Sequence, residues 1–276
     1  YEIGVRLVGS EMCIRDRKPR PDASGEYGTF NTAVIFIAGK DITLRNLTIE
    51  STAGPGYLAG QALAVYAAAD RLSCYNCRFT GWQDTIFNGD PMTCNMKKLM
   101  LPDFFQASEV PIVHKFYRNY FKDCYVCGDV DYIFGPNTAF FDHCEIHSIA
   151  RVSEGKAYIT AASTPAGQEF GLVFSHCRIT GEEPDSVYLG RPWRDCAKTA
   201  FICCELGDHI CPEGWQNWGK VRAEVLSDYI EYGNFGPGAD CSGRSPLSRC
   251  LVNPEVETYF SKENVLVGED GWIPAE

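Results

Sequence analysis

Two stretches of the chain repeat one outline of residues that could carry out acid–base chemistry. GWQDTIF at 81–87 and GDVDYIF at 128–134 both read Gly, two variable residues, Asp, one variable residue, Ile and Phe. In each stretch the aspartate, Asp84 or Asp131, follows a cysteine by seven residues. Equal offsets predict that the two aspartates occupy equivalent positions in a repeating structure.

Two aspartates on neighbouring strands could work as an acid and a base. Stacked strands are spaced by about 4.8 Å, so equivalent carboxyl groups would lie roughly 5 Å apart. Two carboxylates at that distance repel each other, and one of them keeps its proton to a higher pH. A protonated acid beside a carboxylate is the working pair of many hydrolases. The alternative interpretation is a ladder of aspartates that only cap turns.

Four other side chains favour a catalytic interpretation. Arg191 is a permanent cation that could hold one carboxylate ionised through a charge-assisted hydrogen bond, and Trp193 offers a flat apolar face for a sugar ring. Gln61 and Gln83 supply neutral amide donors, which suit a developing oxyanion. Gln83 precedes Asp84 directly, and adjacent residues of a regular strand face opposite ways. Both can therefore reach one site only if the strand ends or bends there.

Short alternating segments recur along the chain and should position these residues. NLTIE, NCRFT, DCYVC, HCEIH, HCRIT and CCELG each alternate polar with apolar residues, the pattern of a half-buried strand. The second position of each segment is Leu47, Cys77, Cys124, Cys144, Cys177 and Cys204, which we expect to form one inward-facing ladder. Intervals of 30, 47, 20, 33 and 27 residues between them, without intervening amphipathic helices, predict a solenoid.

The expected fold is therefore all-β, a right-handed parallel β-helix that lacks its N-terminal coils and cap. A β-sandwich is the competing all-β fold, and it would show turn signals every 8 to 12 residues or so. Asn88-Gly89 is the only Asn-Gly pair in the sequence. One such pair is weak support for a sandwich.

Charge and hydropathy exclude some classes of partner. The net charge is -11, and residues 224–276 carry ten acidic against three basic side chains. Nucleic acid is not expected as a partner, because phosphate binding requires a basic face. No membrane association is expected either, because the apolar runs fall far short of the roughly 18 residues that a membrane span requires.

Cysteine and histidine placement argues against a disulfide framework and against a metal site. The chain has 14 cysteines, including the CxxC pairs Cys74/Cys77 and Cys124/Cys127. Residues three apart in a strand point to opposite faces, so neither pair could chelate one ion. We expect buried free thiols. The five histidines show no triad or ligand spacing and are interpreted as structural: His114, His143, His147, His176 and His209. No metal and no cofactor is expected.

Two segments stand apart from the repeats. Residues 12–17 read MCIRDR, which back-translates to a sequence resembling adaptors of transposon-based sequencing libraries. We expect residues 1–20 to be a non-native or truncated N-terminal segment, and 21–276 to form a single domain. Residues 88–115 form an insertion with three prolines. We expect this loop either to lie beside Asp84 and bear on its function or to be only an addition to the surface.

Five ordered motifs resemble those of a known enzyme family. QALAVYAAAD, GWQDTIF, GDVDYIFG, YLGRPW and PEGWQNW, in this order, are similar to the motif series of the pectin methylesterases, or pectinesterases. The resemblance runs from about Tyr27 to Trp218 and more loosely to the end. It implies hydrolysis of the C6 methyl esters of polygalacturonate, giving methanol and free carboxylates without a metal or a cofactor.

The resemblance implies a role for each candidate residue. Asp131 would be the nucleophile, and Asp84 the general acid that protonates methanol and then the base that activates water. Gln83 and Gln61 would stabilise the tetrahedral oxyanion. Arg191 would orient Asp131.

The same resemblance implies the partner and the setting. Trp193 and Phe134 would contact the sugar, and the partner would be methyl-esterified homogalacturonan or oligogalacturonides, bound by a monomer. The stretch between the two aspartates is longer than is usual in the family. In this respect the chain resembles bacterial members more than plant ones. Members are usually exported, whereas unpaired cysteines favour a reducing or anaerobic setting, so the localisation stays open.

Two alternatives remain at this point. A pectate or pectin lyase shares the β-helix and the substrate class, but it removes a ring proton with an Arg or Lys base. A non-catalytic carbohydrate-binding solenoid would not need the two aspartates in register with Arg191.

Overall fold

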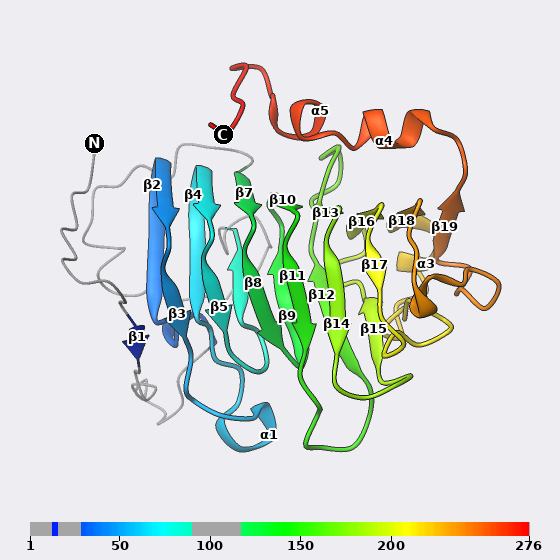
Figure 1. Cartoon of the computed structure of the whole chain (residues 1–276), viewed down its shortest axis with the longest axis horizontal. Helices are drawn as coiled ribbons and strands as arrows, with labels where there is room; N and C mark the ends of the chain where they lie inside the picture. The colour runs from blue at the N-terminus through cyan, green and yellow to red at the C-terminus, as the bar shows by residue number, and fades with distance from the viewer. Residues whose placement is uncertain (1–12, 16–28, 90–116, 276) are drawn as a thin grey trace.

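Parallel strands stack into the coils of a β-helix (Figure 1). The structure is a computed structural model that describes residues 13–15, 29–89 and 117–275. Every strand pair in the described ranges is parallel, and a typical coil contributes one strand to each of three faces. The parallel β-helix predicted from the repeats is confirmed.

Each face is a stack of strands from successive coils. The first face contains the N-terminal parts of β2 (Ile35–Arg45) and β4 (Val65–Tyr75), then β6 (Ile86–Asn88), β9 (Val130–Gly135), β12 (Ala157–Ala162) and β15 (Val187–Gly190). The second face contains the C-terminal parts of β2 and β4, then β7 (Arg118–Lys122), β10 (Thr138–Asp142), β13 (Leu172–Ser175), β16 (Lys198–Ile202), β18 (Asp228–Tyr232) and β19 (Ser248–Leu251). The third face contains β1 (Cys13–Arg15), β3 (Thr48–Glu50), β5 (Arg78–Thr80), β8 (Tyr125–Gly128), β11 (Glu145–Ser148), β14 (Arg178–Gly181) and β17 (Glu205–Leu206).

Helices are short and lie outside the coils. Those in the described ranges are η1 (Thr29–Asn31), α1 (Gly56–Ala59), α3 (Ala223–Leu226), η3 (Pro237–Ala239), α4 (Glu255–Tyr259) and α5 (Lys262–Leu266). Within the described ranges, no helix is both long and apolar enough to cross a membrane.

The two segments that stood apart from the repeats are only partly described. Strand β1 falls inside residues 1–20 and pairs with β3. Of the predicted insertion at 88–115, Asn88 ends β6, and residues from 90 onward lie outside the described residues.

A column of left-handed residues makes the corner between the second and third faces. We call it the corner column: Asn46, Asn76, Asp123, His143, His176 and Cys203, with φ between 49° and 56°. Asn, Asp and His tolerate this conformation better than most residues. Each backbone N–H of the column donates to a carbonyl of the next coil at 2.8–3.0 Å, so the chain turns without losing its pairing between coils.

The predicted cysteine ladder directly follows the corner column and faces the core. Its five cysteines are buried, and Leu47 packs half-buried against the same cluster. The thiols donate to backbone carbonyls, for example Cys144 Sγ to Phe121 O at 3.4 Å and Cys177 Sγ to Phe141 O at 3.3 Å. The ladder is confirmed, and it consists of free thiols.

Aromatic rings repeat with the coils inside the same core. Phe121, Phe141, Phe174 and Phe201 stack in sequence with centroid distances of 4.6, 4.7 and 4.5 Å. These distances match the spacing between parallel strands, about 4.8 Å, so one ring from each coil continues the stack. Flat contact between the rings adds to the burial of their apolar surface.

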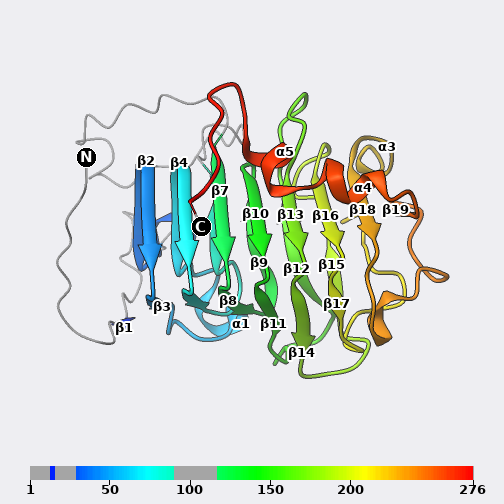
Figure 2. The same ribbon diagram turned by 45° about the horizontal axis from the view of Figure 1, so that its top comes forward.

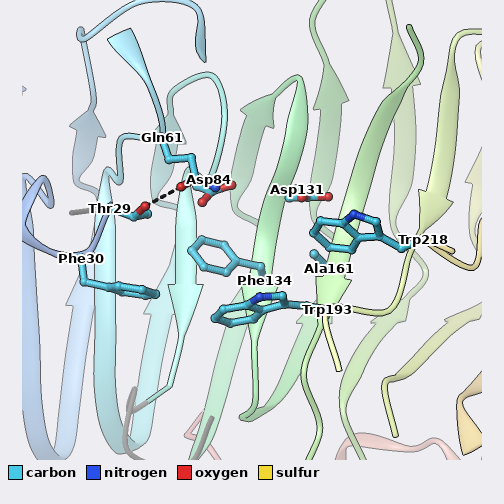
Figure 3. Close-up of a pocket in the computed structure, with 9 residues that line it drawn as sticks. All are labelled: Thr29, Phe30, Gln61, Asp84, Asp131, Phe134, Ala161, Trp193 and Trp218. Carbon is cyan, nitrogen blue, oxygen red and sulfur yellow. Dashed lines mark hydrogen bonds between the residues drawn. The ribbon is translucent and has the colours of Figure 1, made fainter. Parts of the chain in front are cut away.

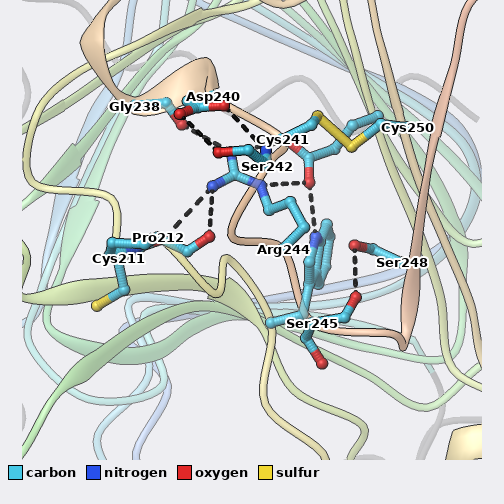
Figure 4. Close-up of a disulfide and its surroundings, with 12 residues drawn as sticks. Cys211, Pro212, Gly238, Asp240, Cys241, Ser242, Arg244, Ser245, Ser248 and Cys250 are labelled. Atoms are coloured by element: carbon cyan, nitrogen blue, oxygen red, sulfur yellow. Dashed lines mark hydrogen bonds and ion pairs between the residues drawn. A yellow bond between two sulfur atoms is a disulfide. The ribbon is translucent and has the colours of Figure 1, made fainter.

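The prediction that the cysteines are unpaired is wrong for one pair. Cys241 and Cys250 form a disulfide between the segment before β19 and β19 itself (Figure 4). Beside it, Arg244 holds the buried carboxylate of Glu231 through two hydrogen bonds of 2.9 and 3.0 Å. The pair escaped sequence reasoning because both cysteines lie outside the repeated segments.

The C-terminal segment runs back over the second face, from β19 towards β4 (Figure 2). Val256, Val265 and Leu266 of α4 and α5 join the apolar cluster on this face. Further along, Asp270 forms ion pairs of 2.6 Å with both Arg71 and Arg118. The segment thus fastens coils that are far apart from it in sequence.

His209 is a buried histidine packed between two glycines. Its side chain is 1% exposed, and a Cβ on Gly181 or Gly207 would come within 2.4 or 2.7 Å of its ring. Among the described residues, its Nε2 has no hydrogen-bond partner. Burial lowers the pKa of His209 to about 4.

We expect His209 to make stability depend on pH. The unfolded chain takes up a proton near pH 6.5, whereas the folded chain does so near pH 4, so the unfolded state binds more protons between these values. Stability should fall as the pH falls through this window, by up to about 3 kcal/mol from this residue. Urea unfolding of the parent and of His209→Gln at pH 7 and pH 4.5 tests this. The stability difference between them should shrink at the lower pH, and parallel pH profiles would contradict the assignment.

Candidate active site

The two aspartates of the repeated motif lie on successive coils. β6 pairs with β9 in a register that matches Ile86 with Ile133 and Phe87 with Phe134. Asp84 and Asp131 precede these partners by equal offsets, and the Asp84 N–H donates to the carbonyl of Val130 at 3.0 Å. The predicted equivalence of the two positions is confirmed.

Both aspartates adopt a left-handed backbone conformation. Their φ angles are 67° for Asp84 and 51° for Asp131. Asp84 lies in a turn before β6, and the register of β9 against β12 shifts between Tyr158 and Thr160, which is a bulge beside Asp131. Bulges commonly redirect a side chain next to an active site. Neither aspartate lies in a regular strand, so the expectation that the adjacent side chains of Gln83 and Asp84 face opposite ways does not apply here.

The glycine of the repeated motif is required by close packing. A Cβ on Gly81 would lie 2.7 Å from Thr85 Oγ1, and a Cβ on Gly128 would lie 2.3 Å from the Cβ of Tyr132. In each coil the turn before the aspartate folds back onto the residue after it. Only glycine leaves the space for this approach.

A cavity of about 230 Å³ joins the predicted residues (Figure 3). It is lined by Thr29, Phe30, Gln61, Asp84, Asp131, Phe134, Ala161, Trp193 and Trp218. Both aspartates border it although each is only 4% exposed. Five of the seven predicted site residues thus line one cavity. The other two, Gln83 and Arg191, are not among the lining residues.

Arg191 holds Asp131 from outside the cavity lining. Its Nε and Nη2 donate to the two carboxylate oxygens at 2.8 and 2.7 Å. The guanidinium lies between two rings, 3.9 Å from the centroid of Tyr158 and 3.7 Å from that of Trp218. A planar cation held on both faces and along its donor edge has little freedom to move. Asp131 is therefore fixed in orientation.

The electrostatic setting separates the two carboxyl groups. Burial raises the pKa of both, and the charge of Asp131 raises the pKa of Asp84 further. At Asp131 the hydrogen bonds and charge of Arg191 oppose the effect of burial. Asp129, a third buried carboxyl, also raises the pKa of Asp84. Of the two, Asp84 is the carboxyl whose pKa is raised more, and Asp131 is the one whose ionised form Arg191 stabilises through hydrogen bonds.

The two glutamines are placed differently. Gln61 Oε1 accepts a hydrogen bond of 2.6 Å from Thr29 Oγ1, which leaves the amide nitrogen to donate into the cavity. Gln83 packs against α1, where a Cβ on Gly56 would lie 2.3 Å from Gln83 Oε1. Gln61 is therefore the glutamine that faces the space beside the carboxyl pair.

Aromatic rings form an apolar wall of the cavity. Trp193 lies 5.6 Å from Phe134 and 6.5 Å from Phe30 between ring centroids. Such a wall suits the flat apolar face of a sugar ring.

Several residues of the site were not singled out from the sequence. They are Thr29, Phe30, Tyr158, Ala161 and Trp218. Of these five, Trp218 could have been found from the sequence, because it is the last residue of the quoted motif PEGWQNW. Thr29 and Phe30 lie in η1, and Tyr158 and Ala161 lie in β12. None of these four residues belongs to a motif quoted above.

Comparison with known proteins identifies a family. The pattern of the family described as Pectinesterase matches residues 14–90 and 106–269. Pectinesterase 31 of Arabidopsis thaliana is 36% identical over 230 residues, which are 83% of this chain and 62% of that protein. Putative pectinesterase 11 of the same plant is 30% identical over 289 residues, 99% of this chain and 72% of that protein. The chain thus spans under two thirds of the length of the first of these relatives.

Solved structures agree with the sequence relatives. The pectin methylesterase from carrot superposes with a TM-score of 0.75 and 26% identity, over 94% of this chain and 74% of that one. A pectin methylesterase in complex with a hexasaccharide superposes with a TM-score of 0.70 and 25% identity, over 94% and 79%. The resemblance found from the motifs is confirmed. The two sequence relatives are plant proteins, so the expectation of a bacterial-type member stays a prediction.

We expect the pKa of Asp84 to depend on its neighbour. Asp131→Asn removes a negative charge that raises the pKa of Asp84, so that pKa should fall. Carboxyl carbon NMR titration of the parent and the variant measures it. Asp123→Asn is a matched control, because Asp123 also has a left-handed backbone but lies at an exposed corner. An unchanged Asp84 titration in Asp131→Asn would show that the two groups do not interact.

Proposed function

Because the chain belongs to the pectinesterase family, we propose that it is a carboxylic ester hydrolase that removes the methyl groups of pectin. The products would be methanol and free galacturonate carboxylates. The observation that supports this most directly is the pair of buried carboxyl groups bordering one cavity, with only Asp131 held by an arginine. That asymmetry gives one nucleophile and one proton donor.

Asp131 is the proposed nucleophile. A carboxylate oxygen attacks the carbonyl carbon of the C6 methyl ester and forms a tetrahedral intermediate. Arg191 keeps this carboxylate ionised and aimed into the cavity, since two of its donors fix both oxygens. The attack therefore begins from a group with little orientational freedom to lose.

Asp84 is the proposed general acid and base. Its carboxyl proton passes to the methoxy oxygen as the C–O bond breaks, so methanol leaves and a mixed anhydride with Asp131 remains. Asp84, now a carboxylate, takes a proton from a water molecule that attacks the anhydride. Hydrolysis releases the galacturonate carboxylate and restores Asp131. The raised pKa of Asp84 fits the first half of this cycle.

Gln61 is the proposed principal oxyanion donor. The carbonyl oxygen gains negative charge in both tetrahedral intermediates, and a neutral amide can stabilise it without protonating it. The Gln61 carbonyl is already engaged by Thr29, so its amide group is oriented before the substrate binds. Gln83, beside Asp84, is the proposed second donor, although it packs against Gly56 here.

The proposed substrate is methyl-esterified homogalacturonan or oligogalacturonides. The wall made by Trp193 and Phe134 would stack on a sugar ring next to the carboxyl pair. One structural relative is a pectin methylesterase in complex with a hexasaccharide, which supports a ligand of several sugar units.

A lyase is the rival activity and needs a free basic residue at the site. Arg191 is the arginine nearest the carboxyl pair in the site described above, and it is fully engaged by Asp131 and two aromatic rings. The nearby Lys220 is engaged as well, because its Nζ donates to Pro192 O at 2.8 Å and lies 4.0 Å from the ring centroid of Trp218. Bases held in this way cannot approach a ring proton. The geometry therefore favours acyl transfer.

We expect Asp131→Asn to abolish turnover. The amide cannot act as the nucleophile, so methanol release from highly methylated pectin should fall by on the order of 10⁴-fold or more. Asp123→Asn serves as the matched control and should retain parent activity. Unsaturated products absorbing in the ultraviolet would instead reveal a lyase. Binding without either product would indicate a carbohydrate-binding solenoid.

We expect the two glutamines to contribute unequally. Gln61→Ala should lower kcat by about 10²- to 10³-fold with little change in KM, as is typical when one oxyanion donor is lost. Gln83→Ala should have a smaller effect, because the Gln83 amide packs against α1. Initial rates of methanol release for the parent and both variants test the order. A larger loss of kcat in Gln83→Ala than in Gln61→Ala would make Gln83 the principal oxyanion donor.

A further inference from the structure

Part of the corner column carries side chains that ligate metals. Three successive coils place His143, His176 and Cys203 one above the other on the outside of the β-helix. The next corner is Gly233, where a Cβ would lie 3.0 Å from Cys203 Sγ. Glycine at this corner leaves room around the thiol.

A carboxylate from the C-terminal segment completes a cluster. A ring nitrogen of His176, Cys203 Sγ and a carboxylate oxygen of Glu257, on α4, all lie within 4.8 Å of one another. The Nε2 to Oε1 distance is 3.8 Å, which is too long for a hydrogen bond. Another group, Glu231 with Cys241 and Cys250, has similar spacing, but both of its sulfurs are joined in the disulfide.

The imidazole of His176 is already oriented for binding through Nε2. Its Nδ1 lies 3.0 Å from Ser175 Oγ, and its ring stacks on His143 at a centroid distance of 5.2 Å and an interplanar angle of 6°. His143 is held in turn by Asp142, 2.6 Å from its Nδ1. Ligating histidines usually have such a partner on the other ring nitrogen, which fixes the tautomer and the plane of the ring.

The thiol of Cys203 is half-buried at the edge of an apolar cluster. It packs against the apolar cluster of the second face, to which Val256 of α4 also belongs. The thiol is thus accessible to a small ion, and the apolar residues behind it limit the directions from which an ion can approach.

We propose that His176, Cys203 and Glu257 form a binding site for a zinc-class divalent ion. A thiolate, an imidazole and a carboxylate are the ligand types that zinc accepts, with a water molecule in the fourth position. A thiolate disfavours calcium and magnesium. The bond lengths of zinc place neighbouring ligand atoms roughly 3.3 to 3.7 Å apart. The three ligand atoms, within 4.8 Å of one another, would close in around a bound ion.

An ion bound at this site would link α4 to the corners of two coils, far from the carboxyl pair. It does not depend on the proposed esterase activity. Spacing along the sequence could not indicate this site, because the three proposed ligands are 27 and 54 residues apart in the chain. Only the stacking of coils and the return of the C-terminal segment bring them together.

Cobalt binding to the metal-free chain tests the site directly. Co²⁺ should give a thiolate-to-metal charge-transfer band in the near ultraviolet, and zinc should displace it. Cys203→Ser should abolish the band. The matched control is Cys196→Ser, which removes another partly exposed free cysteine and should leave the band intact. Absence of the band in the parent, or its persistence in Cys203→Ser, overturns the proposal.

A second variant keeps the proposal testable if Cys203→Ser does not fold. Glu257→Gln keeps the shape of an exposed side chain and should weaken zinc binding by at least about tenfold in calorimetry. Zinc should also slow backbone hydrogen exchange across α4 in the parent but not in Glu257→Gln. Equal zinc affinity of the parent and Glu257→Gln would exclude Glu257 as a ligand, and with it a metal link between α4 and the coils.

Discussion

Parallel pairing between coils forces equivalent residues to stack at the strand spacing, and the rest of the structure depends on this register. Where the stacked residues are apolar, the arrangement is favourable: the ladder of cysteines and the column of phenylalanine rings fill the core continuously. Where they are aspartates, the same geometry brings two carboxyl groups together away from water. One constraint therefore produces both the continuous core and the buried carboxyl pair.

Stacking alone would leave Asp84 and Asp131 equivalent, and a symmetrical pair cannot divide the work of nucleophile and acid. The asymmetry comes from Arg191, which reaches only Asp131 and is held in place by Tyr158 and Trp218. Burial raises the pKa of both aspartates. The charge of the guanidinium opposes this rise at both, but only at Asp131 does the guanidinium also donate two hydrogen bonds to the carboxylate. A cation supplied from later coils thus distinguishes the two aspartates of a repeated motif, which is the basis of their proposed roles.

Left-handed corners explain why polar and unusual residues recur at fixed places. The corner column changes the direction of the chain while its N–H groups remain bonded to the next coil. Asp84 and Asp131 use the same backbone conformation on another side of the coil, where it turns their side chains towards the cavity. On the outside, the corner column stacks His143, His176 and Cys203, so the repeat that builds the fold also concentrates side chains able to bind metal.

The sequence by itself determined the features that repeat. The equal offsets of Asp84 and Asp131, the cysteine ladder and the parallel β-helix could all be read from it, because a stacked repeat turns spacing along the chain into position in space. The tertiary structure alone decided the features that join residues from unrelated repeats. These are the fixing of Arg191 by Tyr158 and Trp218, the orientation of Gln61 away from that of Gln83, the Cys241–Cys250 disulfide, and the meeting of Glu257 with His176 and Cys203. Such contacts depend on how loops and the C-terminal segment fold back over the coils, and no periodicity in the sequence encodes that path.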